Sequence, residues 1–136
     1  MRRGCYAELP RNHSKAGHNG DCEVEKLAEY RNLIKRILTE YVELDNSQPT
    51  PGVESMLVID EERDHYIWLN VGWSQGRRIK GMTVYARLRD GKFWIEEDWT
   101  ENGIATDLVR AGVPKEDIVL AFHDPEMRRY SEFAVA

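Results

Sequence analysis

Four acidic side chains, Glu96, Glu97, Asp98 and Glu101, lie close together in the sequence and could support phosphodiester chemistry. Hard cations such as Mg²⁺ prefer several oxygen ligands, and a bound Mg²⁺ can activate water for attack on a phosphate ester. The same acids also suit the end of a strand followed by the start of a helix, where the helix dipole favours negative charge. Because no lysine or second acidic motif completes a nuclease site, the structural interpretation is favoured over a metal-dependent enzyme.

His65 and His123 are the only histidines after residue 23. An imidazole can act as a general base or as a metal ligand. The two are far apart in the sequence, and each lies beside an aspartate, Asp64 or Asp124, which is typical of a hydrogen-bonding group in a turn. We therefore predict a structural role for both histidines and no catalytic residue in the chain.

Two cysteines and two histidines near the N-terminus, Cys5, His13, His18 and Cys22, could in principle bind zinc. Their spacing is not that of a zinc finger. We therefore expect no metal site and no bound cofactor. The cysteines also imply no disulfide framework, since both precede the predicted folded domain.

Basic residues cluster in one predicted strand and the turn before it: Arg77, Arg78, Lys80, Arg87 and Arg89. This pattern could form a stripe that contacts DNA phosphates. It could equally be a polar outer face paired with nearby acids, or a surface that binds another protein. The polar face is favoured, and direct DNA contact stays an open alternative.

Large aromatic side chains are also concentrated here, with Tyr66 and Trp68 in one predicted strand and Trp94 in another. Each lies opposite the side of its strand that is predicted to be the main apolar face. If the sheet is covered on one side only, these three form an exposed aromatic patch, which would mark a partner-binding site. If the C-terminal segment covers the second side, they belong to the core. The sequence does not decide between the two arrangements.

The charge of the chain argues against a stand-alone DNA-binding protein. Its 136 residues carry a formal net charge of -5. The first 23 residues hold four basic and three acidic residues, so the remainder has 15 basic and 21 acidic residues. DNA affinity depends largely on basic residues that neutralise phosphates. We find no apolar run of membrane-spanning length and no signal peptide, and so expect a cytoplasmic protein.

The periodicity of apolar residues predicts an α+β domain over residues 24–136, preceded by a disordered extension over residues 1–23. Apolar residues spaced by three and four predict a long amphipathic helix over residues 24–43. Alternating patterns then predict four strands, a second helix and a C-terminal segment that contains a strand; the four strands cover residues 53–60, 65–73, 78–89 and 92–97. Tight connections, including Asp90-Gly91, predict an antiparallel meander with the first helix packed on its inner face.

The alternation also assigns side chains to faces of the predicted sheet. Val53, Leu57 and Ile59 share one side of the first strand. The main apolar face of the second strand is predicted to consist of Ile67, Leu69, Val71 and Trp73. Met82, Val84, Ala86 and Leu88 form the apolar side of the third strand, and Phe93 and Ile95 that of the fourth.

Several blocks, in order, resemble the XisI family of fdxN element excision controlling factors. They are LAEYRNLIKRILTEY at 27–41, ERDHYIWLNVGW at 62–73, RRIKG at 77–81, DGKFWIEED at 90–98, TENGIA at 100–105, LVRAGVPKEDIVLAFHDP at 108–125 and the closing R-x-x-S-E-F-A-V-A. The resemblance runs from about Val24 to Ala136, which is nearly the whole chain after the N-terminal segment.

The resemblance implies a XisI-like fold and a role in programmed excision of a DNA element. Proteins of this family are controlling factors, and a separate recombinase carries out the excision. Their usual partner is XisH, a nuclease-like protein. We therefore expect a non-enzymatic accessory factor that contacts a XisH-type partner or the recombination complex. The residues expected to bind the partner are Tyr66, Trp68, Trp94, Arg77, Arg78, Arg87 and Arg89, and a homo-oligomer is possible.

Overall fold

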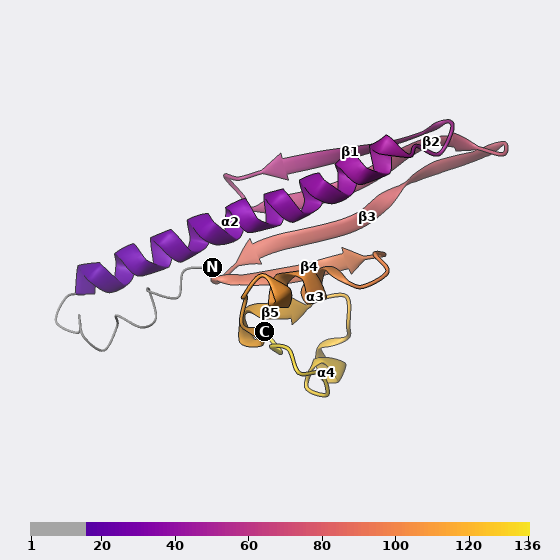
Figure 1. Ribbon diagram of the computed structural model, residues 1–136. Helices are drawn as coiled ribbons and strands as arrows, with labels where there is room; N and C mark the ends of the chain where they lie inside the picture. Colours follow the sequence, from indigo (N-terminus) through magenta and orange to yellow (C-terminus); the bar gives the residue numbers. More distant parts are fainter. Residues whose placement is uncertain (1–15) are drawn as a thin grey trace.

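The computed structural model describes residues 16–136, with side chains from Glu23 onward (Figure 1). Most of residues 1–23, for which disorder is predicted, therefore lie outside the described part. The elements in order are α2 (Ala16–Ser47), β1 (Val53–Asp60), β2 (His65–Ser74), β3 (Arg77–Arg89), β4 (Lys92–Asp98), α3 (Ile104–Arg110), the 3₁₀ turn η1 (Lys115–Asp117), β5 (Ile118–Leu120) and α4 (Pro125–Arg128). The predicted α+β architecture is confirmed.

The long helix α2 forms because one stripe of its side chains is apolar and buried. Tyr30, Ile34 and Leu38 are fully buried and follow one another at the four-residue spacing of a single helix face. The helix ends at Ser47, shortly before two prolines that cannot continue it. It begins at Ala16 rather than at residue 24, so the last part of the predicted disordered extension is helical.

The sheet has the order β1-β2-β3-β4-β5. The first four strands form the predicted antiparallel meander. Two of its turns consist of two residues with positive φ, Gln75-Gly76 and Asp90-Gly91, as a type I′ hairpin turn requires. β5 instead lies parallel to β4, after a connection through α3 and η1.

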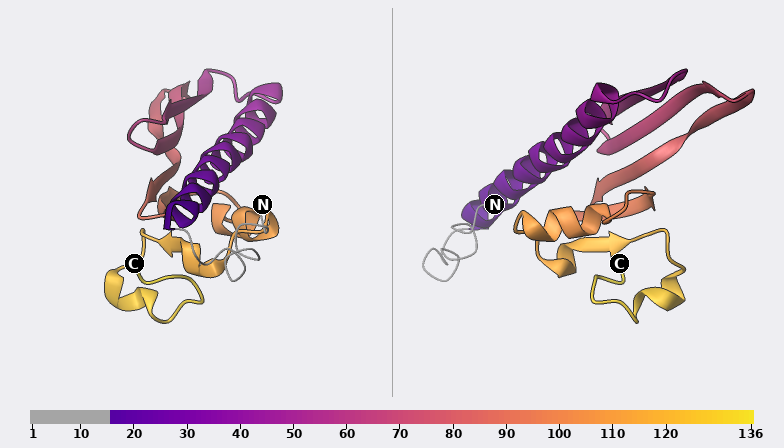
Figure 2. Two further views of the ribbon diagram at one scale, coloured as in Figure 1. Left: turned by 90° about the vertical axis from the view of Figure 1, so that its left-hand side faces the viewer. Right: turned by 45° about the vertical axis from the view of Figure 1, so that its right-hand side comes forward.

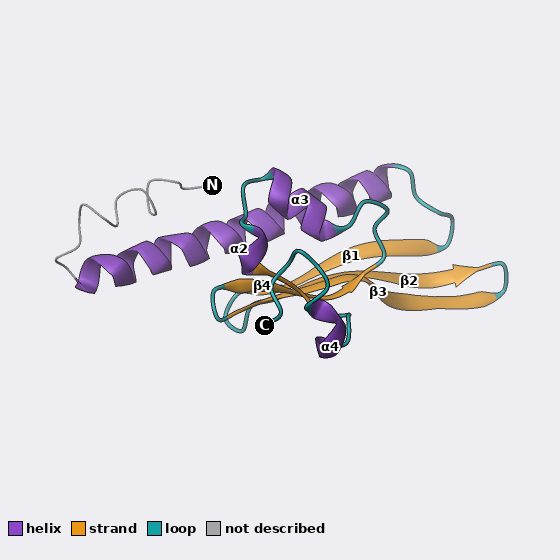
Figure 3. Cartoon of the chain, turned by 90° about the horizontal axis from the view of Figure 1, so that it is seen from below, coloured by secondary structure: helices purple, strands orange, loops and turns teal. Residues whose placement is uncertain are grey.

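The core lies between one face of the sheet and the two helices α2 and α3. Figures 2 and 3 show both helices on the same side of the sheet. The buried cluster joins residues of all these elements, including Ile34 from α2, Val84 and Ile95 from the sheet, and Leu108 from α3. The other face of β1, β2 and β3 is covered by no other element of the described residues; α4 and the last residues lie beside β4 and β5 (Figure 2).

Candidate protein-interaction surface

The sheet face that points away from α2 is here called the open face. Cross-strand partners project to the same side of a sheet, so the register shows which residues share it. Trp68 and Val84 are paired and buried beneath α2. A register shift then pairs Leu69 with Met82, so Met82 lies on the open face and not on the side of Val84 for which it was predicted. Seven apolar side chains then form the centre of the open face: Met56, Val58, Ile67, Leu69, Val71, Met82 and Tyr85. All seven are at least partly exposed.

This arrangement corrects the predicted faces of β2. Ile67, Leu69, Val71 and Trp73 were predicted to form the main apolar face, but the residues that point into the core are Tyr66 and Trp68. Tyr66 is fully buried and Trp68 is 8% exposed. They are therefore not part of an exposed aromatic patch, and the element that covers them is α2 rather than the C-terminal segment. Neither can contact a partner while α2 stays in place.

The polar groups of these two aromatic residues differ in how they are satisfied. The Tyr66 hydroxyl donates to Asp64 Oδ1 at 2.9 Å, and Arg31 of α2 binds the two oxygens of the same carboxylate at 2.7 and 3.1 Å. Burial, followed by the bond to Asp64, raises the pKa of Tyr66 far above its usual value. The Trp68 ring stacks on Tyr41 with 5.7 Å between centroids, but its buried Nε1 has no hydrogen-bond partner.

Three of the predicted partner-binding residues, Arg87, Arg89 and Trp94, come together at one end of the open face. The Arg89 guanidinium lies 5.0 Å from the Trp94 ring centroid, and the Trp94 indole donates to the Arg89 carbonyl at 3.1 Å. Arg128 of α4 lies 5.8 Å from the same ring. Arg87 forms an ion pair with Glu96 at 3.4 Å. We call Arg87, Arg89, Trp94 and Arg128 the arginine–tryptophan cluster.

The other two predicted basic residues, Arg77 and Arg78, lie at the far end of the β2–β3 hairpin, which extends beyond the end of α2 (Figure 1). Trp73 is 59% exposed there, and the Arg78 guanidinium lies 5.7 Å from its ring centroid. At about 3.3 Å per residue, Arg78 and Arg87 are roughly 30 Å apart along β3. The predicted basic stripe is therefore divided into two separate groups.

Three of the four acids that could have held Mg²⁺, Glu96, Glu97 and Asp98, have other partners. Glu96 pairs with Arg87, and Glu97 accepts from the Trp99 indole at 2.7 Å. Asp98 organises the loop to α3, since its Oδ1 accepts from the Thr100 amide and its Oδ2 accepts from the Ile104 amide. Within residues 23–136 no group of three or more His, Cys, Asp or Glu side chains is arranged to hold a metal ion.

The histidines also make local contacts. His65 Nδ1 lies 2.8 Å from the Tyr85 hydroxyl on the open face, and His123 packs against Phe122. Cys5, His13, His18 and Cys22, which were considered as zinc ligands and not expected to bind it, lie outside the described side chains. The described part of the chain holds no helix both long and apolar enough to span a bilayer.

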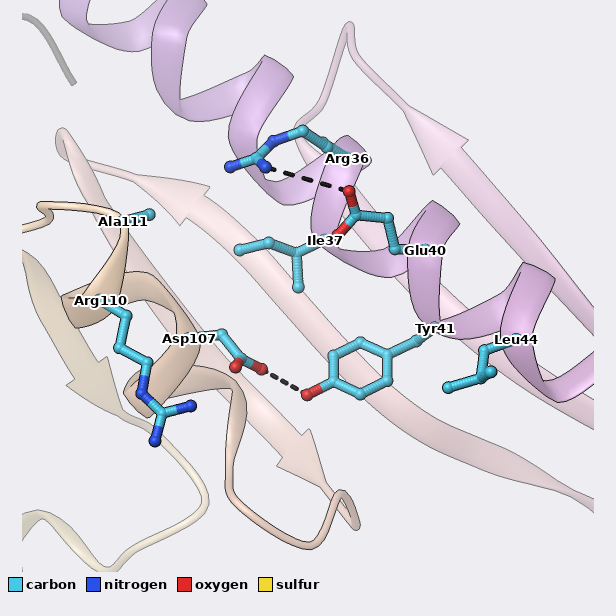
Figure 4. A pocket seen from close by; sticks show the side chains of 8 residues that line it. All are labelled: Arg36, Ile37, Glu40, Tyr41, Leu44, Asp107, Arg110 and Ala111. Atoms are coloured by element: carbon cyan, nitrogen blue, oxygen red, sulfur yellow. Dashed lines mark hydrogen bonds and ion pairs between the residues drawn. The ribbon is translucent and has the colours of Figure 1, made fainter.

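A cavity of about 400 Å³ separates α2 from α3 (Figure 4). It is lined by apolar side chains of α2, including Ile37 and Leu44, and by charged groups of both helices. Across it the Tyr41 hydroxyl donates to Asp107 Oδ2 at 2.5 Å. Burial, and then this bond to a carboxylate, raise the pKa of Tyr41 to about 12. The contact holds α3 against α2, a role that the sequence pattern did not indicate.

The described geometry can be compared with known proteins. The model of the XisI protein family matches residues 24–135. A XisI-like protein of Anabaena variabilis is 39% identical, with a TM-score of 0.75 over 81% of this chain and 99% of its own. The fdxN element excision controlling factor XisI of Anabaena variabilis is 42% identical, with a TM-score of 0.70 over 82% of this chain and 99% of its own. None of the curated proteins matches significantly. Sequence and fold agree along nearly the whole described domain, and the chain therefore belongs to the XisI family.

Proposed function

We propose that this chain is a non-enzymatic controlling factor for programmed excision of a DNA element, and that it acts in the cytoplasm through protein–protein contact. Its family and its 42% identity to the excision controlling factor XisI of Anabaena variabilis support the process. The partner we propose is a XisH-type nuclease-like protein, alone or within the recombination complex. Strand cleavage and joining would then be the task of that complex.

The observation that carries the contact mechanism is the pairing of arginine with tryptophan at both ends of the open face. Arg89 lies over Trp94 at one end, and Arg78 lies over Trp73 at the other. Tryptophan and arginine dominate the energetics of protein interfaces because they bury a large area and keep a polar group. A guanidinium held over an indole ring also presents its free edge to a carboxylate of a partner. Both pairs therefore suit a protein surface that carries acids.

Direct DNA binding by the basic residues of β3 is less well supported by the geometry. Arg87 is paired with Glu96, so Arg89 is the residue left at this end of β3 to meet a phosphate. The remaining group on the hairpin is short, and the net charge of -5 opposes the approach of a phosphate backbone. A complex with so few phosphate contacts would have a low affinity at physiological salt.

Co-expression with the XisH-type protein tests the proposal. A tagged XisH-type protein should retain this chain, and calorimetry with the purified pair should give a dissociation constant in the micromolar range or tighter. Trp94→Ala and Arg78→Ala should each weaken binding by roughly tenfold or more, as expected for interface anchors. Arg36→Ala, which removes an exposed arginine of α2, is the matched control and should bind as the wild type does. No complex at roughly 100 µM of each protein would refute the proposed partner.

A further inference from the structure

The apolar centre of the open face is not used by the proposed partner contact. Its seven side chains occupy three adjacent strands, with Ile67 paired to Val58 on one side and to Tyr85 on the other. Val58 is 42% exposed although it lies within a strand. A contiguous apolar surface of this kind on a folded domain marks a place where another protein surface packs.

Charged side chains of opposite sign lie on the two sides of this apolar centre. On the open face β1 carries two acids, Glu54 and Asp60, and β3 carries four cations, Arg78, Lys80, Arg87 and Arg89. Glu54 and Lys80 lie at one level of the sheet, since both pair with Val71. Asp60 and Arg87 lie at a second level, since both pair with His65. One side of the apolar centre is thus acidic and the other side is basic.

The charges at the first level have no partner within the described chain. Glu54 and Lys80 are both exposed, and neither forms an ion pair with any described residue. Val71 separates them on the strand between, so the pair is not neutralised within one copy. If a second copy of the open face is turned by 180° about the direction of the strands and laid on the first, its Lys80 meets Glu54 and its Glu54 meets Lys80.

We propose that a second copy of this chain covers the open face, related by a two-fold axis that runs parallel to β2. This rotation keeps the levels and exchanges the borders, so β1 of each copy lies over β3 of the other. Glu54 then faces Lys80 of the second copy, and this contact occurs twice by symmetry. Asp60 and Arg87 also come to lie opposite each other, although each is paired within its own copy, with Arg63 and Glu96. A two-fold axis across the strands would instead place Glu54 over Asp60 and Lys80 over Arg87, which are repulsive pairs.

The size of the surface indicates a reversible dimer. Three strands about 4.8 Å apart and about 20–30 Å long give a flat footprint of roughly 300–450 Å² per copy. This footprint is a lower limit to the buried area because side chains project from it. Stable interfaces bury about 800 Å² per partner, so the dimer should dissociate in the micromolar range. The charge-free centre agrees with the apolar character of interfaces between identical subunits. This inference does not depend on the proposed XisH-type partner.

Sedimentation equilibrium of the full chain, over roughly 1–200 µM, tests the dimer. The wild type should change from one to two copies across this range. Glu54→Lys and Lys80→Glu should each weaken the dimer roughly tenfold, since each substitution creates two repulsive pairs. The double variant should return to within about threefold of the wild type. Glu43→Lys, which makes the same change of charge on an exposed residue of α2, should have no effect.

Several outcomes would overturn the proposal. A wild type that stays monomeric at every concentration would refute the proposed dimer. A dimer whose strength is unaffected by Glu54→Lys, or that the double variant does not restore, places the interface elsewhere. If the wild type is monomeric and Val58→Lys abolishes binding of the XisH-type protein, that partner and not a second copy covers the open face. Circular dichroism of each variant shows whether the fold is retained. If Val58→Lys does not fold, the exposed variants Glu54→Lys and Lys80→Glu still test the dimer.

Discussion

Replacing Arg31 by methionine tests how α2 is fixed on the sheet. The Arg31 guanidinium binds both oxygens of Asp64, at 2.7 and 3.1 Å, and the Tyr66 hydroxyl bonds to the same carboxylate. Asp64 is 14% exposed and Arg31 is 30% exposed at the side chain, so solvent screens the pair only in part. These contacts raise the pKa of Arg31, first through the hydrogen bond to Asp64. Methionine keeps most of the aliphatic contact of the arginine and removes the charge.

The expected loss in free energy of unfolding follows from the hydrogen bonds that Arg31→Met removes. Each hydrogen bond to a charged group contributes about 1.5–3 kcal/mol, and the Tyr66 bond that remains offsets part of the loss at Asp64. We expect Arg31→Met to lower the free energy of unfolding by about 2 kcal/mol. For a domain of about 120 residues this corresponds to a fall of roughly 8 °C in Tm.

The control lies on the same helix. Arg36 is 60% exposed and 4.0 Å from Glu40, so Arg36→Met should change the free energy of unfolding by less than about 0.5 kcal/mol. Urea unfolding followed by tryptophan fluorescence measures both variants. If Arg31→Met and Arg36→Met cost the same, the Arg31–Asp64 contact does not fix the helix and the reasoning is wrong.

Three further predictions concern pH, backbone geometry and packing. The pKa of Tyr41 is about 12 in the folded chain and about 10 in the unfolded chain. The contribution of its neutral hydroxyl to the free energy of unfolding is therefore complete below pH 10 and is lost as the pH rises toward 12. Tyr41→Phe should reduce this alkaline loss of stability, measured by urea unfolding, by roughly 1–2 kcal/mol. A Cβ on Gly72 would lie 2.0 Å from the Gly52 carbonyl oxygen, so Gly72→Ala should cost roughly 3 kcal/mol or more; a Tm within about 2 °C of the wild type would contradict this. Ile95 is fully buried between the sheet and the helices, and Ile95→Ala should lower the free energy of unfolding by about 3–4 kcal/mol, which a denaturant midpoint close to that of the wild type would disprove.

The sequence predicts those elements whose signals are local. The stripe of apolar residues places α2, and Asp90-Gly91 fixes the β3–β4 hairpin because both residues must adopt positive φ. The start of α2 is missed because residues 16–23 lack apolar periodicity. Extending an existing helix costs less than starting one, so the helix continues into a segment that has no such pattern.

The reversed faces of β2 have an explanation in the turn that precedes it. With four residues from Glu61 to Asp64 between the strands, Asp60 pairs with His65, and Leu57 must then pair with Trp68. Paired residues share a face, so an inward Leu57 requires an inward Trp68. The sequence therefore contains the information, but it appears only when the register of the hairpin is considered together with the alternation of each strand.

The arginine–tryptophan cluster could be predicted only in part. Arg87, Arg89 and Trp94 belong to one hairpin, and their proximity follows from the tight turn. Arg128 reaches Trp94 because the chain crosses over through α3 and β5 and returns beside β4. Its guanidinium also donates to the Ala121 carbonyl at 3.1 Å. No local pattern indicates this contact, since it depends on the tertiary path of the C-terminal segment.

A DNA cleavage assay tests the central claim, that this chain acts by contact and leaves strand chemistry to its associates. The purified chain is incubated with DNA of the excised element and Mg²⁺, alone and in increasing ratio to the XisH-type protein. We expect the DNA to stay intact with the chain alone, and the activity of the XisH-type protein to change until the two proteins are equimolar. Cleavage or joining of DNA by the purified chain alone, or activity of the partner that is unaffected by it at every ratio, would contradict the account.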